Sequence, residues 1–235
     1  MDGHESRRLA MSGYYPLMVN LVGRRCVVIG GGKIAERKVN GLLESGANDV
    51  LVVALEASGG ILELSAKGSI RLEQRAYKEE DLVDAFLVFA ATNVRQINQS
   101  VASHGARLGL LVNVADKAEE GVFISPSTLR RGGLLLTVTT GGASPALTAQ
   151  IKQELAKQYG EDYAQKVEML GLLRERMLLR GSFDSFRHEV LRKAAEQLAG
   201  NNIDVEVDTF SPSQLEAYID QWMIQLQQNV DRRQR

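Results

Sequence analysis

A glycine-rich turn near the start of the chain has the residue types and spacing of a phosphate-binding loop. Gly30, Gly31 and Gly32 follow the apolar run 26–29, and the helical pattern that comes next includes Ala35. In the G-x-G-x-x-A pattern, Gly30 allows a tight turn, Gly32 lets the backbone approach a pyrophosphate, and Ala35 permits close packing of helix on strand. The motif predicts a dinucleotide site, and a purely structural turn is the alternative.

An acid after the second apolar run indicates which dinucleotide binds. The acid that bonds the ribose of NAD stands about 20 residues after the first glycine, near the end of the second strand. Here the second run ends at Ala54 and the nearest acid is Glu56. No Lys or Arg lies between Lys38 and Lys67, so no local cation is available for the 2′-phosphate of NADP. The sequence therefore favours NAD, unless Glu56 is only a solvated loop residue.

Asp116 is the best candidate for a catalytic base. It follows the fifth apolar run, 110–115, and ligands of open parallel sheets bind beyond the carboxyl ends of the strands. Hydride transfer to a nicotinamide needs a group that takes the accompanying proton. A surface loop acid is the alternative, because Lys117, Glu119 and Glu120 are close neighbours in the sequence.

No residue pattern predicts a metal site. His4, His104 and His188 are scattered, and none has ligand spacing with another His, a Cys or an acid, so each is interpreted as a surface or packing histidine. The single Cys26 lies inside an apolar run, which indicates a buried thiol in a reducing compartment and excludes an intrachain disulfide. We therefore expect a cytoplasmic protein.

Composition and charge narrow the classes of partner. The chain has 235 residues, 44% of them hydrophobic, and a formal net charge of -1. No overall field attracts nucleic acid or an anionic membrane, so we expect neither as a partner. No apolar run approaches the roughly 18 residues of a membrane helix. Residues 1–13 lack the apolar core of a signal peptide and are expected to form a flexible arm.

Alternating strand and helix patterns would position these residues. Short runs rich in Val, Ile and Leu predict strands at 26–29, 50–54, 69–74, 86–91 and 110–115. Helical spacing with glycines near the ends predicts helices at 33–46, 57–68 and 94–109. Such alternation predicts an α/β fold with a parallel sheet that is covered on both faces.

The pattern changes after Asp116. The segments 122–128 and 133–140 have the composition of two further strands, joined by a basic turn at 129–133. Their apolar, weakly charged edges predict that they pair across a homodimer.

The rest of the chain has a helical pattern, apart from residues 201–210. One helix begins cleanly after Ser144, its predicted N-cap, with Pro145 at the first helical position. Ser211, Pro212 and Gln214 give a second cap signal.

Four motifs stand in order along the chain: GGGKIAERK at 30–38, FAATN at 89–93, LVNVAD at 111–116 and TTGGASPALTAQIKQEL at 139–155. Together with the segment YYPLMVNLVGRR at 14–25, they resemble the precorrin-2 dehydrogenase and sirohydrochlorin ferrochelatase family. The same module forms the N-terminal part of siroheme synthases. The resemblance covers residues 14–178, and the C-terminal segment matches only as a helical tail.

The resemblance implies an NAD-dependent oxidation of precorrin-2 to sirohydrochlorin by a homodimer. It implies a Rossmann-type NAD-binding domain over 14–116, a small α+β dimerisation region over 117–150 and a helical C-terminal domain over 151–235. Some family members also insert ferrous iron, but Lys117 and Ala118 stand where the family often has further acids, which disfavours that activity. An NAD-binding redox sensor and an oxidoreductase acting on another small substrate stay open as alternatives.

The resemblance also assigns roles to single residues. Asp116 matches the functional aspartate of the family, and Ser144 matches the serine of its GG-x-SP motif. The residues that match cofactor-binding positions are Gly30, Gly31, Gly32, Lys33, Ile34, Ala35, Leu55, Glu56, Thr92 and Asn93. Because precorrin-2 carries many carboxylates, its candidate ligands are Arg130, Arg131, Lys152 and the helix start at Ser144. A solvated basic turn is equally consistent with the arginine pair.

Overall fold

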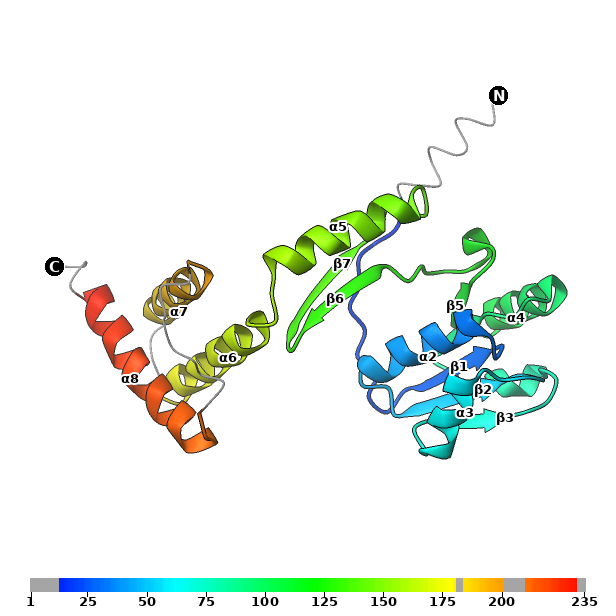
Figure 1. The fold of residues 1–235 in the computed structure, drawn as a ribbon, viewed down its shortest axis with the longest axis horizontal. Helices are drawn as coiled ribbons and strands as arrows, with labels where there is room; N and C mark the ends of the chain where they lie inside the picture. Colours follow the sequence, from blue (N-terminus) through cyan, green and yellow to red (C-terminus); the bar gives the residue numbers. More distant parts are fainter. Residues whose placement is uncertain (1–12, 181–183, 201–209, 232–235) are drawn as a thin grey trace, which may run out of the picture. The chain divides into compact units, whose positions relative to one another are not determined.

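The computed structural model describes residues 13–180, 184–200 and 210–231, in two compact units (Figure 1). The first unit is Met1–Ser125 and the second is Pro126–Arg235. The predicted arm lies outside the described residues except for Gly13. The predicted domain boundaries at residues 116 and 150 stay predictions.

The first unit contains a five-stranded parallel sheet, as the sequence predicts. Its strands are β1 (Arg25–Ile29), β2 (Asp49–Val53), β3 (Arg71–Glu73), β4 (Leu87–Ala90) and β5 (Leu111–Val114). They are arranged in the order β3-β2-β1-β4-β5, and every neighbouring pair is parallel. The chain therefore reverses its direction of winding between β1 and β4, which is where ligands bind in open sheets of this class.

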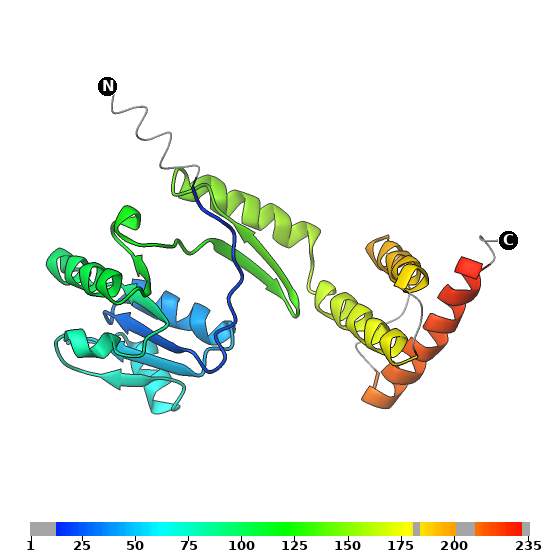
Figure 2. The ribbon, with the colours of Figure 1, turned by 180° about the vertical axis from the view of Figure 1, so that it is seen from behind.

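Both faces of the sheet are covered because successive strand residues point to opposite sides. Cys26 and Val28 of β1 belong to one core with α2 (Lys33–Glu44) and α3 (Gly59–Ala66). Val27 and Ile29 belong to a second core with η1 (Glu79–Leu82) and α4 (Arg95–Arg107). Figures 1 and 2 show these helices and the sheet from opposite sides.

Cys26 is a fully buried free thiol, as predicted, and burial raises its pKa to about 11.

The chain after β5 differs in detail from the sequence-based prediction. Residues 122–125 are not a strand: the backbone N–H of Val122 donates to the carbonyl of Val112, and the Asn113 amide donates to the carbonyl of Phe123. A short η2 (Ala118–Glu120) precedes this segment. Single bonds of this kind hold the segment beside β5 without a strand ladder.

A two-stranded antiparallel hairpin opens the second unit, formed by β6 (Ser127–Arg131) and β7 (Leu134–Val138). The prediction that 129–133 form the turn was wrong, because Arg130 and Arg131 are paired strand residues. The turn consists of Gly132 and Gly133 alone, and Gly132 has a φ of 53°, a conformation that favours glycine.

The described residues of the second unit also form four helices: α5 (Pro145–Gln158), α6 (Tyr163–Leu179), α7 (Asp184–Ala199) and α8 (Pro212–Asp231). Both predicted caps are confirmed: the hydroxyl of Ser144 accepts from the backbone N–H of Leu147, and Ser211 exchanges hydrogen bonds with Gln214. Helices α6 to α8 share a core around Leu173. Residues 201–209 lie outside the described part of the chain. Among the residues that are described, no helix is long and apolar enough to cross a membrane.

Candidate functional site

The three glycines of the loop after β1 have different surroundings. Gly30 has a φ of 124°, and a Cβ placed on it would lie 2.4 Å from the carbonyl oxygen of Ala91. A Cβ on Gly31 would lie 2.0 Å from the carbonyl oxygen of Glu56. A Cβ on Gly32 would meet no atom within 4 Å. Gly30 and Gly31 are therefore required by packing, whereas the backbone at Gly32 is open to a ligand.

Helix α2 begins without a side-chain cap in the described part of the chain. Gly32 is its N-cap residue, in extended conformation, and the first helical bond runs from the N–H of Glu36 to the carbonyl of Gly32 at 2.9 Å. The earlier N–H groups of a helix have no partner within it, and they form the positive end of the helix dipole. Ala35 is fully buried, so the helix packs tightly on the sheet at this point. The arrangement can bind an anion.

The loop after β2 lies against the glycine loop. The N–H of Ser58 donates to the carbonyl of Gly31 at 2.8 Å. Leu55 and Glu56 are both exposed at the carboxyl end of β2, and 73% of the Leu55 surface is accessible. Ile34 is also half exposed. Leu55 and Glu56 are the residues predicted for the ribose end of a dinucleotide, and Ile34 is predicted for the start of the cofactor-binding helix.

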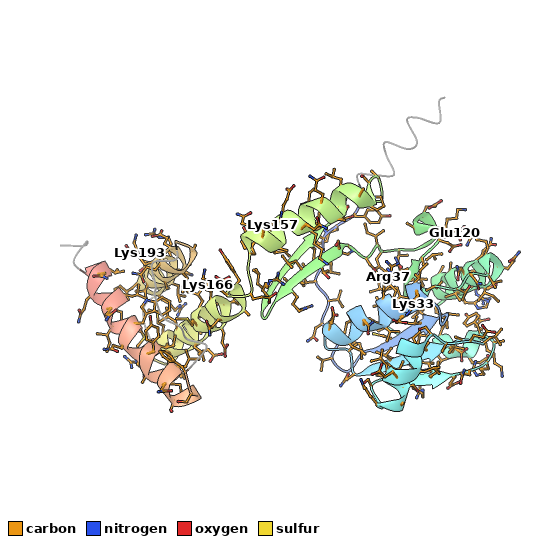
Figure 3. All side chains as sticks on the ribbon, in the orientation of Figure 1. Lys33, Arg37, Glu120, Lys157, Lys166 and Lys193 are labelled. Carbon is orange, nitrogen blue, oxygen red and sulfur yellow. The ribbon has the colours of Figure 1, made fainter. Side chains whose placement is uncertain are left out.

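Glu36 is a part of this region that the sequence did not single out. Its carboxylate accepts a hydrogen bond from the Ser58 hydroxyl at 2.5 Å and lies 3.0 Å from the Lys33 ammonium. Ser58 first, and then Lys33, hold the pKa of the Glu36 carboxyl below its ordinary value. Lys33, which Figure 3 labels on α2, is therefore neutralised by a carboxylate of the same helix.

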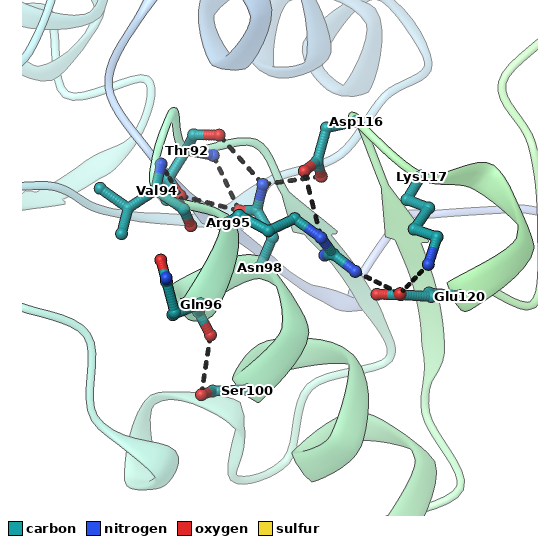
Figure 4. A network of polar contacts seen from close by, with 9 residues as sticks. All are labelled: Thr92, Val94, Arg95, Gln96, Asn98, Ser100, Asp116, Lys117 and Glu120. Carbon is teal, nitrogen blue, oxygen red and sulfur yellow. Dashed lines mark hydrogen bonds and ion pairs between the residues drawn. The ribbon is translucent and has the colours of Figure 1, made fainter.

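Thr92, Asn93 and Asp116 follow the carboxyl ends of β4 and β5. The Asp116 side chain is 39% exposed, and its Oδ1 accepts a hydrogen bond of 2.8 Å from the Asn98 amide. Its Oδ2 lies 3.8 Å from Nε of Arg95 (Figure 4). Asn93 is exposed in the same turn as Thr92. The carboxylate is thus hydrogen-bonded through Oδ1, lies near a cation through Oδ2, and is partly exposed.

An ion-pair cluster flanks Asp116. Arg95 of α4 bonds the carboxylate of Glu120, which also lies 2.9 Å from the Lys117 ammonium. Arg95 first, and then Lys117, hold the pKa of Glu120 below its ordinary value. The sequence placed Lys117 and Glu120 only as solvated neighbours of Asp116. Nothing local in the sequence indicates Arg95, because it stands 25 residues before Glu120.

The residues predicted to bind the substrate lie in the second unit. Arg130 and Arg131 are successive strand residues, so their side chains point to opposite faces of the hairpin. Arg131 is 15% exposed and bonds the carbonyl of Tyr159 and the carboxylate of Glu161, whereas Arg130 is exposed. The hairpin therefore does not present the two arginines as a pair.

The other two substrate candidates belong to α5. The hydroxyl of Ser144 already caps this helix through Leu147, at 3.2 Å. Lys152 is half-buried on the same helix. Of the four candidates, Arg130 and Lys152 are the side chains without an evident structural task.

No group of three or more His, Cys, Asp or Glu in the described residues could hold a metal ion. His104 lies on α4, where its Nδ1 is 2.8 Å from the Tyr77 hydroxyl and its Nε2 is 3.7 Å from Glu79. His188 lies on α7, and His4 is outside the described residues. The contacts of His104 are those of a packing histidine.

Comparison with known proteins relates both units to one family. The sequence matches a family model described as putative NAD(P)-binding over 17–127, and a model described as sirohaem biosynthesis protein central over 131–158. It is 38% identical over 177 residues to the precorrin-2 dehydrogenase of Priestia megaterium. The aligned residues are 75% of this chain and 87% of that protein.

Two further relatives extend the comparison. A siroheme synthase of Psychromonas ingrahamii is 39% identical over 142 residues, which is 60% of this chain and 30% of the synthase. The solved structure of SirC, a precorrin-2 dehydrogenase, has a TM-score of 0.68 and 32% identity, over 89% of this chain and 98% of that chain. The chain thus spans most of the dehydrogenases but less than half of the siroheme synthases named among its relatives.

Proposed function

The chain belongs to the family of precorrin-2 dehydrogenases and siroheme synthases, and from this premise we propose that it oxidises precorrin-2 to sirohydrochlorin with NAD as hydride acceptor. The fold is that of a nicotinamide-dependent oxidoreductase. The observation that supports the proposal best is the position of Asp116. It follows β5 at the same edge of the sheet at which the open backbone of Gly32 and the uncapped start of α2 lie.

The residues at the start of α2 fit a dinucleotide. Gly32 leaves its backbone accessible, and the free N–H groups that follow it, from Lys33 to Ala35, suit a pyrophosphate. Leu55 and Glu56 suit the adenosine end of the cofactor, and Thr92 and Asn93 suit the neighbourhood of the nicotinamide. When bound, the nicotinamide supplies the hydride acceptor. The protein itself orients the cofactor and removes a proton.

Asp116 is the group to which we assign the proton. The oxidation removes a hydride and a proton from the substrate, so an acceptor other than the cofactor is needed for the proton. The carboxylate is partly exposed, and Asn98 and Arg95 hold it from one side. Iron insertion is not part of the proposal, because Lys117 and Ala118 stand where further acids would be needed to take the pyrrole protons.

The preference for NAD over NADP is argued from Glu56 and Glu36. Glu56 stands where an acid would bond the free 2′-hydroxyl of NAD. Lys33 is a further cation near the ribose end, but Glu36 neutralises it at 3.0 Å. With that pair neutral, the carboxylate of Glu56 leaves a net negative charge at this end of the site, which would repel a 2′-phosphate.

The remaining parts of the proposal concern the substrate and the assembly. We assign the substrate carboxylates to Arg130 and Lys152, with Arg131 and the start of α5 at Ser144 as weaker candidates, since both already have internal contacts. The hairpin β6–β7 has two strands and therefore unpaired edges, which suits pairing across a homodimer. A cytoplasmic location is proposed from the buried free thiol of Cys26.

One experiment tests the reaction. The purified chain is mixed with NAD⁺ and enzymatically made precorrin-2, and the absorbance spectrum is followed until it changes to that of sirohydrochlorin and NADH. Binding of NAD⁺ without any spectral change of the tetrapyrrole would contradict the proposal and favour a redox sensor.

A further inference from the structure

Asn98 of α4 is a fully buried amide at the site, and neither the motifs nor the cofactor pattern assigns it a role. It lies one turn before Val101 and two turns before Gly105, on the buried stripe of the helix. A buried amide costs stability unless all its polar atoms are bonded. Its partners therefore show what it does.

Both polar atoms of the Asn98 side chain are hydrogen-bonded, and their partners lie just after two different strands. Oδ1 accepts from the backbone N–H of Thr92 at 3.1 Å and lies 2.8 Å from the Thr92 hydroxyl, whose single hydrogen is shared between Asn98 and the carbonyl of Val94 at 3.0 Å. Nδ2 donates to the carbonyl of Thr92 at 3.0 Å and to Oδ1 of Asp116 at 2.8 Å (Figure 4). Thr92 follows β4 and Asp116 follows β5, so one side chain joins the two strand ends.

The orientation of this amide is fixed by its partners. A backbone N–H can only donate, so the atom that faces the N–H of Thr92 must be the amide oxygen. The nitrogen then faces the Thr92 carbonyl and Asp116, and both of its hydrogens have acceptors. The amide cannot rotate by half a turn without losing bonds at both ends. It therefore holds the Asp116 carboxylate in one place relative to Thr92.

We propose that Asn98 is a positioning residue for the oxidation: its amide fixes the Asp116 carboxylate relative to Thr92, and so to the cofactor. This inference rests on the proposed function, in which Asp116 accepts the proton and Thr92 lies beside the nicotinamide. Arg95 cannot replace the amide, because its Nε lies 3.8 Å from Asp116 and its guanidinium bonds Glu120. A misplacement of about 1 Å at a reacting group lowers rates by about 100-fold.

The test is a double-mutant cycle with Asp116. We expect Asn98→Ala to lower kcat by about 10- to 100-fold in the otherwise unchanged protein. In the Asp116→Asn background, where no base is left to position, the same change should lower the residual kcat by less than about 3-fold. A residue that only supports the fold would lower kcat by the same factor in both backgrounds, and that result would overturn the proposal.

Asn113 provides a matched control. It is also a buried asparagine of the first unit, and its amide donates to the carbonyl of Phe123 rather than to Asp116. We expect Asn113→Ala to lower thermal stability, with equal effects on kcat in the two Asp116 backgrounds. If Asn98→Ala does not fold, the cycle is repeated with Asn98→Ser, and failure of both to fold would overturn the proposal in favour of a structural role.

The cycle also separates this inference from the proposed function. If Asp116→Asn keeps full activity, the base is elsewhere, and the assignment of Asp116 and the role of Asn98 fall together. If Asp116→Asn loses activity while the Asn98 effect is the same in both backgrounds, only the positioning role falls.

Discussion

Replacing Gly32 by Asp separates cofactor binding from folding, because the structure predicts opposite effects on the two. Gly32 has a φ of -81° and space for a side chain, so Asp fits without strain. It would occupy the N-cap of α2, where no side chain of the described residues accepts from the first turn. An Asp cap stabilises a helix by only about a few tenths of a kcal/mol relative to a Gly cap, and about 1 kcal/mol raises Tm by about 2–4 °C in a chain of this length, so Tm should stay the same or rise by about 1 °C.

The same carboxylate would occupy the anion site. A like charge against a pyrophosphate costs several kcal/mol, and each 1.4 kcal/mol is tenfold in affinity, so the affinity for NAD⁺ should fall by at least about 100-fold. Calorimetric titration with NAD⁺ and a thermal melt measure the two effects on one sample. Unchanged NAD⁺ affinity in a folded Gly32→Asp protein would refute the reasoning and make the loop purely structural.

Gly31→Ala is the control for this prediction. Its Cβ would lie 2.0 Å from the carbonyl oxygen of Glu56, so the two loops must move apart. Overpacking of this kind costs about 1–3 kcal/mol. We expect a lower Tm for Gly31→Ala and an unchanged or higher Tm for Gly32→Asp, although the two glycines are neighbours in the sequence.

Three further predictions concern specificity, pH and assembly. Glu36→Gln should release Lys33 and raise the use of NADP⁺ relative to NAD⁺ by about 2- to 5-fold, the worth of an exposed ion pair; an unchanged ratio of kcat/KM values would contradict this. Burial alone would raise the pKa of Asp81, but its hydrogen bonds from Arg75 and the N–H of Lys78 hold the pKa below 3.8. The stability that Asp81 contributes is therefore present above about pH 4 and lost below it. On acidification, the free energy of unfolding measured with urea should fall further for the unchanged protein than for Asp81→Asn. Equal decreases in the two proteins would contradict this role of Asp81. Light scattering at micromolar concentration should report a homodimer, and a stable monomer would show that the β6–β7 edges do not pair between copies.

The sheet could be predicted from the sequence because its strands are encoded locally. Strands β1, β2, β4 and β5 contain Val, Leu or Ile residues that are buried against a helix layer, and Leu72 of β3 is partly buried in the same way. The cap of α5 was equally local, since Ser144 and its partner Leu147 are three residues apart. The hairpin was misplaced because two arginines beside two glycines resemble a turn in composition. Only Gly132 and Gly133 are needed to reverse the chain, and the arginines extend the strand.

Other features of the site depend on contacts between distant residues. Asn98 bonds Asp116 across 18 positions in the sequence. Gly31 is required because the carbonyl oxygen of Glu56 lies where its Cβ would be. The one local signal for Asn98 was an asparagine at helical spacing with Val101 on an otherwise apolar stripe. Glu36 gave no such signal, since an acid in the first turn of a helix is ordinary, and its bond to Ser58 spans 22 positions.

The most direct test of the central claim is the rate of precorrin-2 oxidation by Asp116→Asn. The substitution keeps the size and the hydrogen bond from Asn98 but removes the base, so the rate should fall by a factor on the order of 100 to 10,000. NAD⁺ affinity should be nearly unchanged, because the glycine loop is untouched.

Glu119→Gln is the control for this measurement, since Glu119 is an exposed acid three residues away. We expect it to keep the full rate. The account predicts loss of turnover in Asp116→Asn alone, measured from the absorbance of sirohydrochlorin and NADH. Full dehydrogenase activity of Asp116→Asn would contradict it.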